Sequence, residues 1–264
     1  MNARYDDALL DLVEGAWAWQ VWSRLGWQEI RRRYRRTAIG PFWTTLSLGG
    51  FIGVLGFIWA GLWGQDPKTY LPFLCAGMIS WNLIQSNVHD GCTVFVVGET
   101  FIKQLRFPYS MLAWSLVWRN VILFAHHLVI FGIVALYAGV PVTATSLLVI
   151  PGVILNSLNG VWIAMVLGVV CARYRDVQQL VISLLQIAMF VTPILFAREQ
   201  LAPQLEALVD YNVLFHYVEL IRAPLLGRAP APLSWNVAAL SLVGGWAAML
   251  WFYNRFRRRV PYWL

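Results

Sequence analysis

Apolar runs long enough to cross a membrane alternate with short polar segments along the chain. A helix needs about 20 apolar residues to cross the hydrocarbon core of a bilayer. Residues 41–63 carry no charged side chain, and a second apolar run covers residues 71–97, with Asp90 near its end. Residues 120–172 contain no Asp, Glu, Lys or Arg, which is enough for two helices divided by the turn-forming residues 138–146.

Two further apolar runs, residues 177–197 and 229–254, complete the pattern. The sequence therefore predicts an all-α membrane protein with six transmembrane helices. We expect a single transmembrane domain over residues 1–264. Its expected parts are spans one to five in residues 41–197, span six in residues 231–254 and a polar tail in residues 255–264.

Two segments are amphipathic rather than uniformly apolar. Within residues 1–40, Trp27, Ile30 and Tyr34 recur at i, i+3 and i+7 beside arginines, a pattern typical of a helix that lies on a membrane surface. Residues 198–230, between spans five and six, are too polar to cross a bilayer and too apolar for a free loop. We expect an N-terminal interfacial helix and external re-entrant helices that the rest of the protein covers.

Positive charge is concentrated in alternate connecting segments. Arginines and lysines occupy the segment before span one, the loops after spans two and four, and the tail, whereas the other loops carry few or a mixed set. Connecting segments rich in Lys and Arg face the cytoplasm. We therefore expect a multi-pass protein with both termini in the cytoplasm.

The composition agrees with a membrane protein and narrows its anionic partners. Of 264 residues, 59% are hydrophobic and only 12% are charged, whereas soluble domains carry roughly 25% charged residues. The net charge of +7 would suggest nucleic acid as the partner of a soluble protein. Because the charge lies beside apolar spans, we expect a membrane surface or a phosphorylated lipid and no nucleic acid.

The densest positive cluster is RRRYRR, residues 31–36, directly before span one. Orientation of the protein and contact with lipid explain part of it. Arginine also binds phosphate with a planar fork of donors. Four arginines are therefore candidates for binding a lipid diphosphate head group: Arg31, Arg32, Arg35 and Arg36.

Two charged residues, Asp90 and Arg119, lie inside apolar runs. At about 1.5 Å per residue both are roughly 10 to 16 Å inside their predicted helix ends. Intramembrane charges tend to pair or to face an aqueous cavity, so we expect an ion pair between them. The alternative is that Arg119 reaches the interface and Asp90 meets interfacial water. We expect no metal site and no catalytic residue.

The loop of residues 98–108 connects spans two and three on the cytoplasmic side. It is either a solvated turn with orienting charges or a docking element for a cytoplasmic partner. The docking candidates are Phe101, Lys103, Gln104, Arg106, Phe107 and Pro108. The sequence contains no Walker A motif, so any ATP that powers the protein would be hydrolysed on another chain.

Five segments occur in register with this topology: RRRYRRTAIGPFW, FIKQLRFP, CARYRDV, TPILF and YVELIRAPLLG. Together they resemble the membrane subunits of bacterial ABC transporters that export polysaccharides, namely the O-antigen, capsule and teichoic-acid permeases. The resemblance covers essentially the whole chain. One departure is Asn212–Val213, where this family is expected to have Asn-Pro.

The resemblance implies a transport subunit rather than an enzyme. It implies a homodimer that forms a channel for a lipid-linked polysaccharide, O-antigen above all, across the bacterial inner membrane. Two copies of a separate ATPase would bind ATP and Mg, this chain would bind no cofactor, and the loop of residues 98–108 would be the coupling helix. Spans one and five would line the channel, where the aromatic candidates are Phe42, Trp59, Phe190 and Phe196.

Two alternatives stay open at the level of the sequence. An ABC exporter permease for teichoic acid, capsule or small hydrophobic compounds shares the topology. A membrane-embedded enzyme acting on polyprenyl-phosphate substrates would need acidic catalytic residues or a metal cluster at one membrane face. Only Asp90 and scattered acids are available for that chemistry.

Overall fold

The computed structural model describes residues 8–35, 37, 39–40, 42–202 and 209–264. All regular secondary structure in these residues is helical. The long helices are α2 (Trp19–Arg33), α3 (Phe42–Leu62), α4 (Pro67–Gly91), α7 (Ser110–Ala138), α8 (Val149–Arg173), α9 (Val177–Val191) and α12 (Pro232–Phe256). The shorter ones are α1 (Ala8–Trp17), α5 (Val94–Val97), α6 (Glu99–Gln104), η2 (Ala144–Leu148), η3 (Arg198–Gln200), α11 (Val213–Leu225), η4 (Arg257–Arg259) and α13 (Val260–Trp263).

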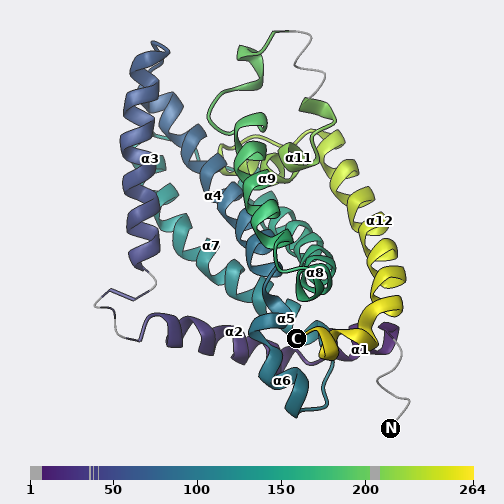
Figure 1. Ribbon diagram of the computed structural model, residues 1–264. Coiled ribbons are helices and arrows are strands. Elements are labelled where there is room, and N and C mark those ends of the chain that lie inside the picture. Colours follow the sequence, from purple (N-terminus) through teal and green to yellow (C-terminus); the bar gives the residue numbers. More distant parts are fainter. Residues whose placement is uncertain (1–7, 36, 38, 41, 203–208) are drawn as a thin grey trace.

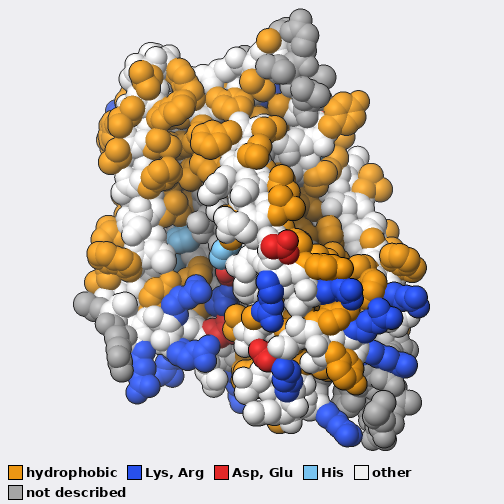
Figure 2. All heavy atoms as spheres, viewed as in Figure 1, with side chains coloured by type: hydrophobic (Ala, Val, Ile, Leu, Met, Phe, Trp, Pro, Cys, Tyr) orange, Lys and Arg blue, Asp and Glu red, His pale blue; other side chains and the backbone are white. Residues whose placement is uncertain are grey.

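The long helices other than α2 form a bundle, and α1 and α2 lie across one end of it (Figure 1). The short helix α6 projects beyond α1 and α2, and the C-terminal α13 lies at the same end (Figure 1). Lys and Arg side chains gather in a band at this end, whereas hydrophobic side chains cover much of the same face above it (Figure 2). The arginine-rich segments of the sequence therefore share one end of the molecule.

Four helical stretches are long and apolar enough to cross a membrane: Phe42–Leu62, Ser110–Ala138, Ala144–Arg173 and Pro232–Trp263. The protein is therefore a multi-pass membrane protein. Of the six predicted spans, those of α4 and α9 do not qualify on length and composition. Helix α9 is apolar but has only 15 residues.

Helix α4 is the most enclosed of the long helices. Its 25 residues rise about 37 Å, which exceeds the roughly 30 Å thickness of the hydrocarbon core. Most of its residues are buried, and it packs against α3, α7, α8, α9 and α11. Its polar residues Ser80 and Asn87 are therefore enclosed by protein rather than by lipid, so this helix does not need the apolar composition of a lipid-facing span.

The predicted second span is interrupted. Helix α4 ends at Gly91, and α5 starts only at Val94. At this break α4 lies directly against α8, because a Cβ added at Gly91 would be 2.8 Å from Ala164 Cα. The expected continuous helix through residue 97 is therefore wrong.

The prediction of a helix through residue 197 is also wrong, because α9 ends at Val191. Pro193 has no N–H to donate, and its ring disfavours helical conformation at Thr192. The buried backbone that follows is hydrogen-bonded by other segments: Tyr70 Oη donates to the Leu195 carbonyl at 2.6 Å, and Arg222 Nη1 donates to the Pro193 carbonyl at 2.6 Å. Irregular backbone inside a membrane protein needs such cover.

The two non-spanning segments differ in detail from the expectation. The interfacial segment forms two helices instead of one, with a non-helical residue at Ala18 (ψ 34°). On the opposite side, α11 is largely buried and packs against α4, α8 and α12. The structure describes only part of the expected re-entrant segment, because residues 203–208 lie outside the described residues.

Two apolar clusters hold the bundle together. One joins α4 and α11 to the residues after α9, and its fully buried members include Leu74, Ile194 and Leu220. The other joins α5, α8, α12 and α13 near the arginine-rich end, around Phe95 and Met165. The second cluster packs these elements together at the arginine-rich end, next to the start of α7.

Candidate functional site

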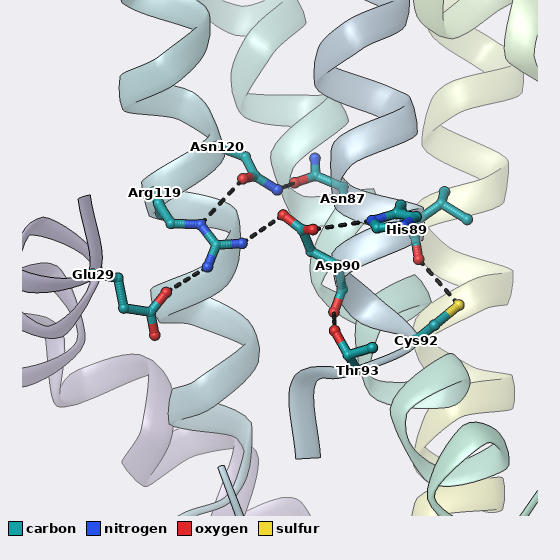
Figure 3. A network of polar contacts seen from close by, with 9 residues as sticks. Glu29, Asn87, His89, Asp90, Cys92, Thr93, Arg119 and Asn120 are labelled. Carbon is teal, nitrogen blue, oxygen red and sulfur yellow. Dashed lines mark hydrogen bonds and ion pairs between the residues drawn. The ribbon is translucent and has the colours of Figure 1, made fainter. Parts of the chain in front are cut away.

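The centre of the candidate site is Arg119 on α7, which lies between two carboxylates from other helices (Figure 3). Its Nη2 is 2.5 Å from Asp90 Oδ2 on α4, and its Nη1 pairs with Glu29 on α2. The Arg119 side chain is only 12% exposed. The ion pair predicted between Asp90 and Arg119 is therefore present. Glu29 is a third member, which the sequence pattern does not predict.

A chain of hydrogen bonds extends this ion pair into the bundle (Figure 3). Arg119 Nε donates to Asn120 Oδ1 at 3.4 Å, and Asn120 Nδ2 donates to Asn87 Oδ1 at 3.0 Å. On the other side, His89 Nδ1 lies 3.2 Å from Asp90 Oδ1. The network thus ties the interfacial helix α2 to α4 and α7 through one cation and two carboxylates.

The sequence pattern does not single out Glu29, because the arginines that follow it dominate this segment. One signal in the sequence was available, since Glu29 is the only acidic residue between Glu14 and Asp66. A single carboxylate on the apolar-facing side of an arginine-rich helix needs a cationic partner once it is removed from water. Arg119 supplies that partner.

A cavity of about 590 Å³ opens beside the network. Three cations and two carboxylates line it together with residues of α5, α6 and α7. The charged lining residues are Glu29, Arg32, Arg33, Asp90 and Arg119. The cavity therefore combines the end of the arginine cluster, the ion-pair network and the base of α6.

The four arginines chosen from the sequence are not placed alike. Arg32 lines the cavity. Arg33, which is not among the predicted head-group ligands, lines it as well. Arg31 and Arg35 are exposed and are not among the lining residues. Arg36 lies outside the described residues.

The predicted docking loop forms the short helix α6 and the turn that follows it. Phe101 is 47% exposed, whereas its neighbour Ile102 is buried. Lys103 Nζ donates to Glu99 Oε1 at 2.6 Å, and this hydrogen bond lowers the pKa of Glu99. The projecting surface of α6 is thus apolar at its centre and flanked by an ion pair.

The remaining docking candidates lie after α6. Gln104 and Arg106 are exposed, whereas Phe107 and Pro108 are half-buried. Phe107 packs edge-on against the Tyr109 ring, with centroids 5.8 Å apart. Helix α7 starts two residues after Pro108, at Ser110, so the proline precedes the helix rather than opening it.

The four aromatic candidates do not come together in one place within the chain. Phe42 packs edge-on against His126, and Trp59 against Trp63, with centroids 5.2 Å and 4.6 Å apart. Phe190 is 65% exposed on α9, while Phe196 is half-buried after that helix. Other apolar side chains of α9 are exposed as well, namely Leu180, Leu184, Ile187 and Val191.

A second cavity, of about 870 Å³, lies at the opposite end of the bundle between α4, α11 and the start of α12. It is lined by charges of both signs, including the pair Arg198–Asp210, in which Nη1 and Nη2 donate to Oδ1 and Oδ2 at 2.6 and 3.0 Å. No pattern in the sequence predicts this cavity, whose lining comes from distant segments of the chain. Among the described residues, no group of three His, Cys, Asp or Glu side chains is arranged to hold a metal ion.

Most of the chain matches a known protein family. Residues 20–226, from the second residue of α2 to the residue that follows α11, match the family described as ABC-2 type transporter. The chain belongs to the ABC-2 type transporter family. This ABC-2 protein is therefore a transport subunit of a membrane transporter.

Individual relatives of this ABC-2 protein have names that are more specific. It is 25% identical over 242 residues to the O-antigen export system permease protein RfbA of Myxococcus xanthus. The aligned region covers 86% of this chain and 89% of the relative. Two proteins of the same name from Klebsiella pneumoniae are 21% and 22% identical over 191 residues, or 71% of this chain and 73% of theirs. These matches confirm the resemblance seen in the five sequence segments.

Proposed function

We propose that this ABC-2 subunit forms, as a homodimer, the channel of an ATP-driven exporter for a lipid-linked polysaccharide, with O-antigen as the first candidate. Two copies of a separate ATPase chain bind and hydrolyse ATP with Mg. The exporter lies in the bacterial inner membrane, and both termini face the cytoplasm. Six spans are proposed: α4 crosses inside the bundle, α9 crosses along its outside, and α11 is re-entrant on the external side.

One observation carries the proposal beyond the family. The short helix α6 projects from the arginine-rich end, and its base lines the same cavity as Arg32 and the Arg119 network. A push on α6 by a cytoplasmic ATPase therefore acts directly beside a cationic cavity at the membrane surface. That is where an anionic, lipid-attached substrate has to enter, because a hydrated polymer cannot cross hydrocarbon without a protein-lined path.

The cationic cavity suits the phosphate groups of such a substrate. Arginine binds phosphate oxygens in pairs through its planar donors. Arg32 and Arg33 are exposed and line the cavity, so their donors are available to a ligand. We assign the diphosphate of the lipid carrier to this position and the aromatic side chains Phe42, Trp59, Phe190 and Phe196 to weak contacts with sugars further along the channel.

The first test is genetic and biochemical. Deletion of the gene should remove the polymer from the cell surface while its lipid-linked form accumulates inside, and the tagged protein should co-purify with an ATPase chain. Accumulation of a teichoic-acid or capsule polymer instead would change the substrate but keep the mechanism. Absence of any co-purifying ATPase would contradict the proposal.

The second test concerns docking through α6. Phe101→Ala should reduce ATPase recruitment and export while membrane insertion stays normal, because it removes the apolar centre of the projecting surface. Val142→Ala is a matched control, since Val142 is 89% exposed at the opposite end of the bundle. Equal export by both variants would refute docking through α6.

A further inference from the structure

The side chain of Asp11 on α1 is fully buried at the arginine-rich end and holds three separate segments of the chain. Its carboxylate accepts hydrogen bonds from the Tyr109 and Ser110 amides at 2.8 and 3.0 Å. It also accepts from Arg257 Nη2 at 2.7 Å. One carboxylate thus contacts the N-terminal helix, the start of α7 and the C-terminal tail.

At α7 the contact replaces a missing cap. The first amides of a helix have no partner within the helix. Tyr109, at the N-cap position, makes no side-chain cap, and Asp11 supplies the acceptor from 98 positions away in the sequence. The carboxylate is also placed where the helix dipole favours negative charge.

The backbone of α1 also packs closely against the start of α7. A Cβ added at Gly15 would be 2.1 Å from Ser110 Oγ, and Ser110 Oγ donates to the Asp11 carbonyl at 2.8 Å. Helix α1 therefore contacts the start of α7 at two successive turns. Because α7 begins directly after the α6 loop, α1 is positioned by the segment to which α6 is attached.

The C-terminal tail is held through Arg257, the cation that pairs with Asp11. Arg257 is 5% exposed, its Nε donates to Tyr253 Oη at 3.2 Å, and its guanidinium lies 5.2 Å from the centre of the Tyr109 ring. Beyond it Val260 is buried, and the Trp263 ring contacts the guanidinium of Arg173 at the end of α8. The last residues of the chain are thus part of the base beneath α6 and α8.

We infer that Asp11 is a positioning residue which joins α1, the α6–α7 corner and the C-terminal tail into one body. A displacement of α6 then moves α7, α1 and the tail together. Without the carboxylate, α6 moves while the tail and α1 stay behind, and ATP hydrolysis continues with less transport. This inference rests on the proposed function, because it assigns Asp11 a role in transmitting the movement of an ATPase.

The test uses the full-length protein with its co-purified ATPase in lipid vesicles, and compares Asp11→Asn with Arg257→Gln. Asparagine keeps the size of the side chain but removes the charge and one acceptor. We expect amide hydrogen exchange at Tyr109 and Ser110 to accelerate about tenfold or more, because charge-assisted hydrogen bonds are lost. Arg255→Gln is the control for the tail, since Arg255 is an exposed arginine on the same turn of chain.

The decisive readout is the amount of polymer exported per ATP hydrolysed. Both variants should assemble with the ATPase but export about tenfold less polymer per ATP, while Arg255→Gln equals the wild type. Unchanged hydrogen exchange in Asp11→Asn would overturn the anchoring, and faster exchange with an unchanged export ratio would overturn the coupling role. If the wild type itself shows no ATP-driven export, the proposed function fails, and the hydrogen-exchange result still decides the anchoring.

Discussion

Replacement of Arg119 by methionine tests the ion-pair network most directly. The substitution keeps an unbranched apolar side chain in α7 but leaves Asp90 and Glu29 without their shared cation. Removing one partner of a buried ion pair costs about 3–5 kcal/mol, because the remaining charge is left uncompensated. Here the carboxylate side chains are 21% and 32% exposed, so water reduces the expected loss to about 2–4 kcal/mol.

The structure also dictates the controls. A charge exchange between positions 90 and 119 cannot restore the pair, because an aspartate at position 119 would face Glu29. The proper rescue is the triple variant Glu29→Gln, Asp90→Asn, Arg119→Met, in which no charge remains unpaired. We expect this variant to be within about 1 kcal/mol of the wild type. Arg119→Lys should fall between, because an ammonium group cannot serve two carboxylates with a planar fork.

The assay is reversible unfolding in mixed micelles with increasing denaturing detergent, followed by tryptophan fluorescence. The chain has 15 tryptophans, so loss of tertiary packing is readily detected. If Arg119→Met leaves the free energy of unfolding unchanged, or if the triple variant is as unstable as Arg119→Met alone, then the network does not hold α2 to the bundle.

Three further predictions follow from local contacts. Gly245→Ala should destabilise the protein by about 1–3 kcal/mol, because the new Cβ would be 2.2 Å from a tryptophan ring on α8; its neighbour Gly244 has open space, and Gly244→Ala should be neutral or slightly stabilising in the same unfolding assay. Asn212→Ala should cost about 1 kcal/mol, because it removes the side-chain cap of α11; an unchanged unfolding midpoint would exclude that role. Lys103 lowers the pKa of Glu99 below its ordinary value of 4.5. The ion pair therefore stabilises the fold above pH 4.5 and loses its effect as the pH falls through the lowered pKa. The difference in unfolding free energy between the wild type and Glu99→Gln should vanish in acid.

The helix pattern could be predicted from the sequence wherever the helix faces lipid. Spans such as Phe42–Leu62 and Pro232–Phe256 are close to the expected residues, because continuous apolar surface is visible in a single chain. The ends of α4 and α9 could not be predicted in the same way. Gly91 and Pro193 end these helices where another helix approaches or where distant side chains satisfy the backbone.

The charged contacts were predictable only where burial alone demands a partner. Asp90 and Arg119 lie in apolar runs, so each needed an opposite charge nearby, and the topology left few choices. Asp11 and Glu29 lie in amphipathic segments, where an acidic residue normally meets water. The contacts of these two carboxylates depend on how α1 and α2 pack against α7, which no periodicity in those segments encodes.

The structure separates two roles among the arginines that line the cavity beside the Arg119 network. The network around Arg119 already contains two carboxylates, so this arginine is compensated and is a poor site for a further anion. Arg32 and Arg33 add two cations to the same cavity, which leaves its lining with a net charge of one positive. An anionic head group that enters the cavity is therefore attracted to the end of α2 and not to the ion pair. Neutralising Arg32 and Arg33 should weaken export without destabilising the bundle, whereas removing Arg119 should destabilise the bundle itself.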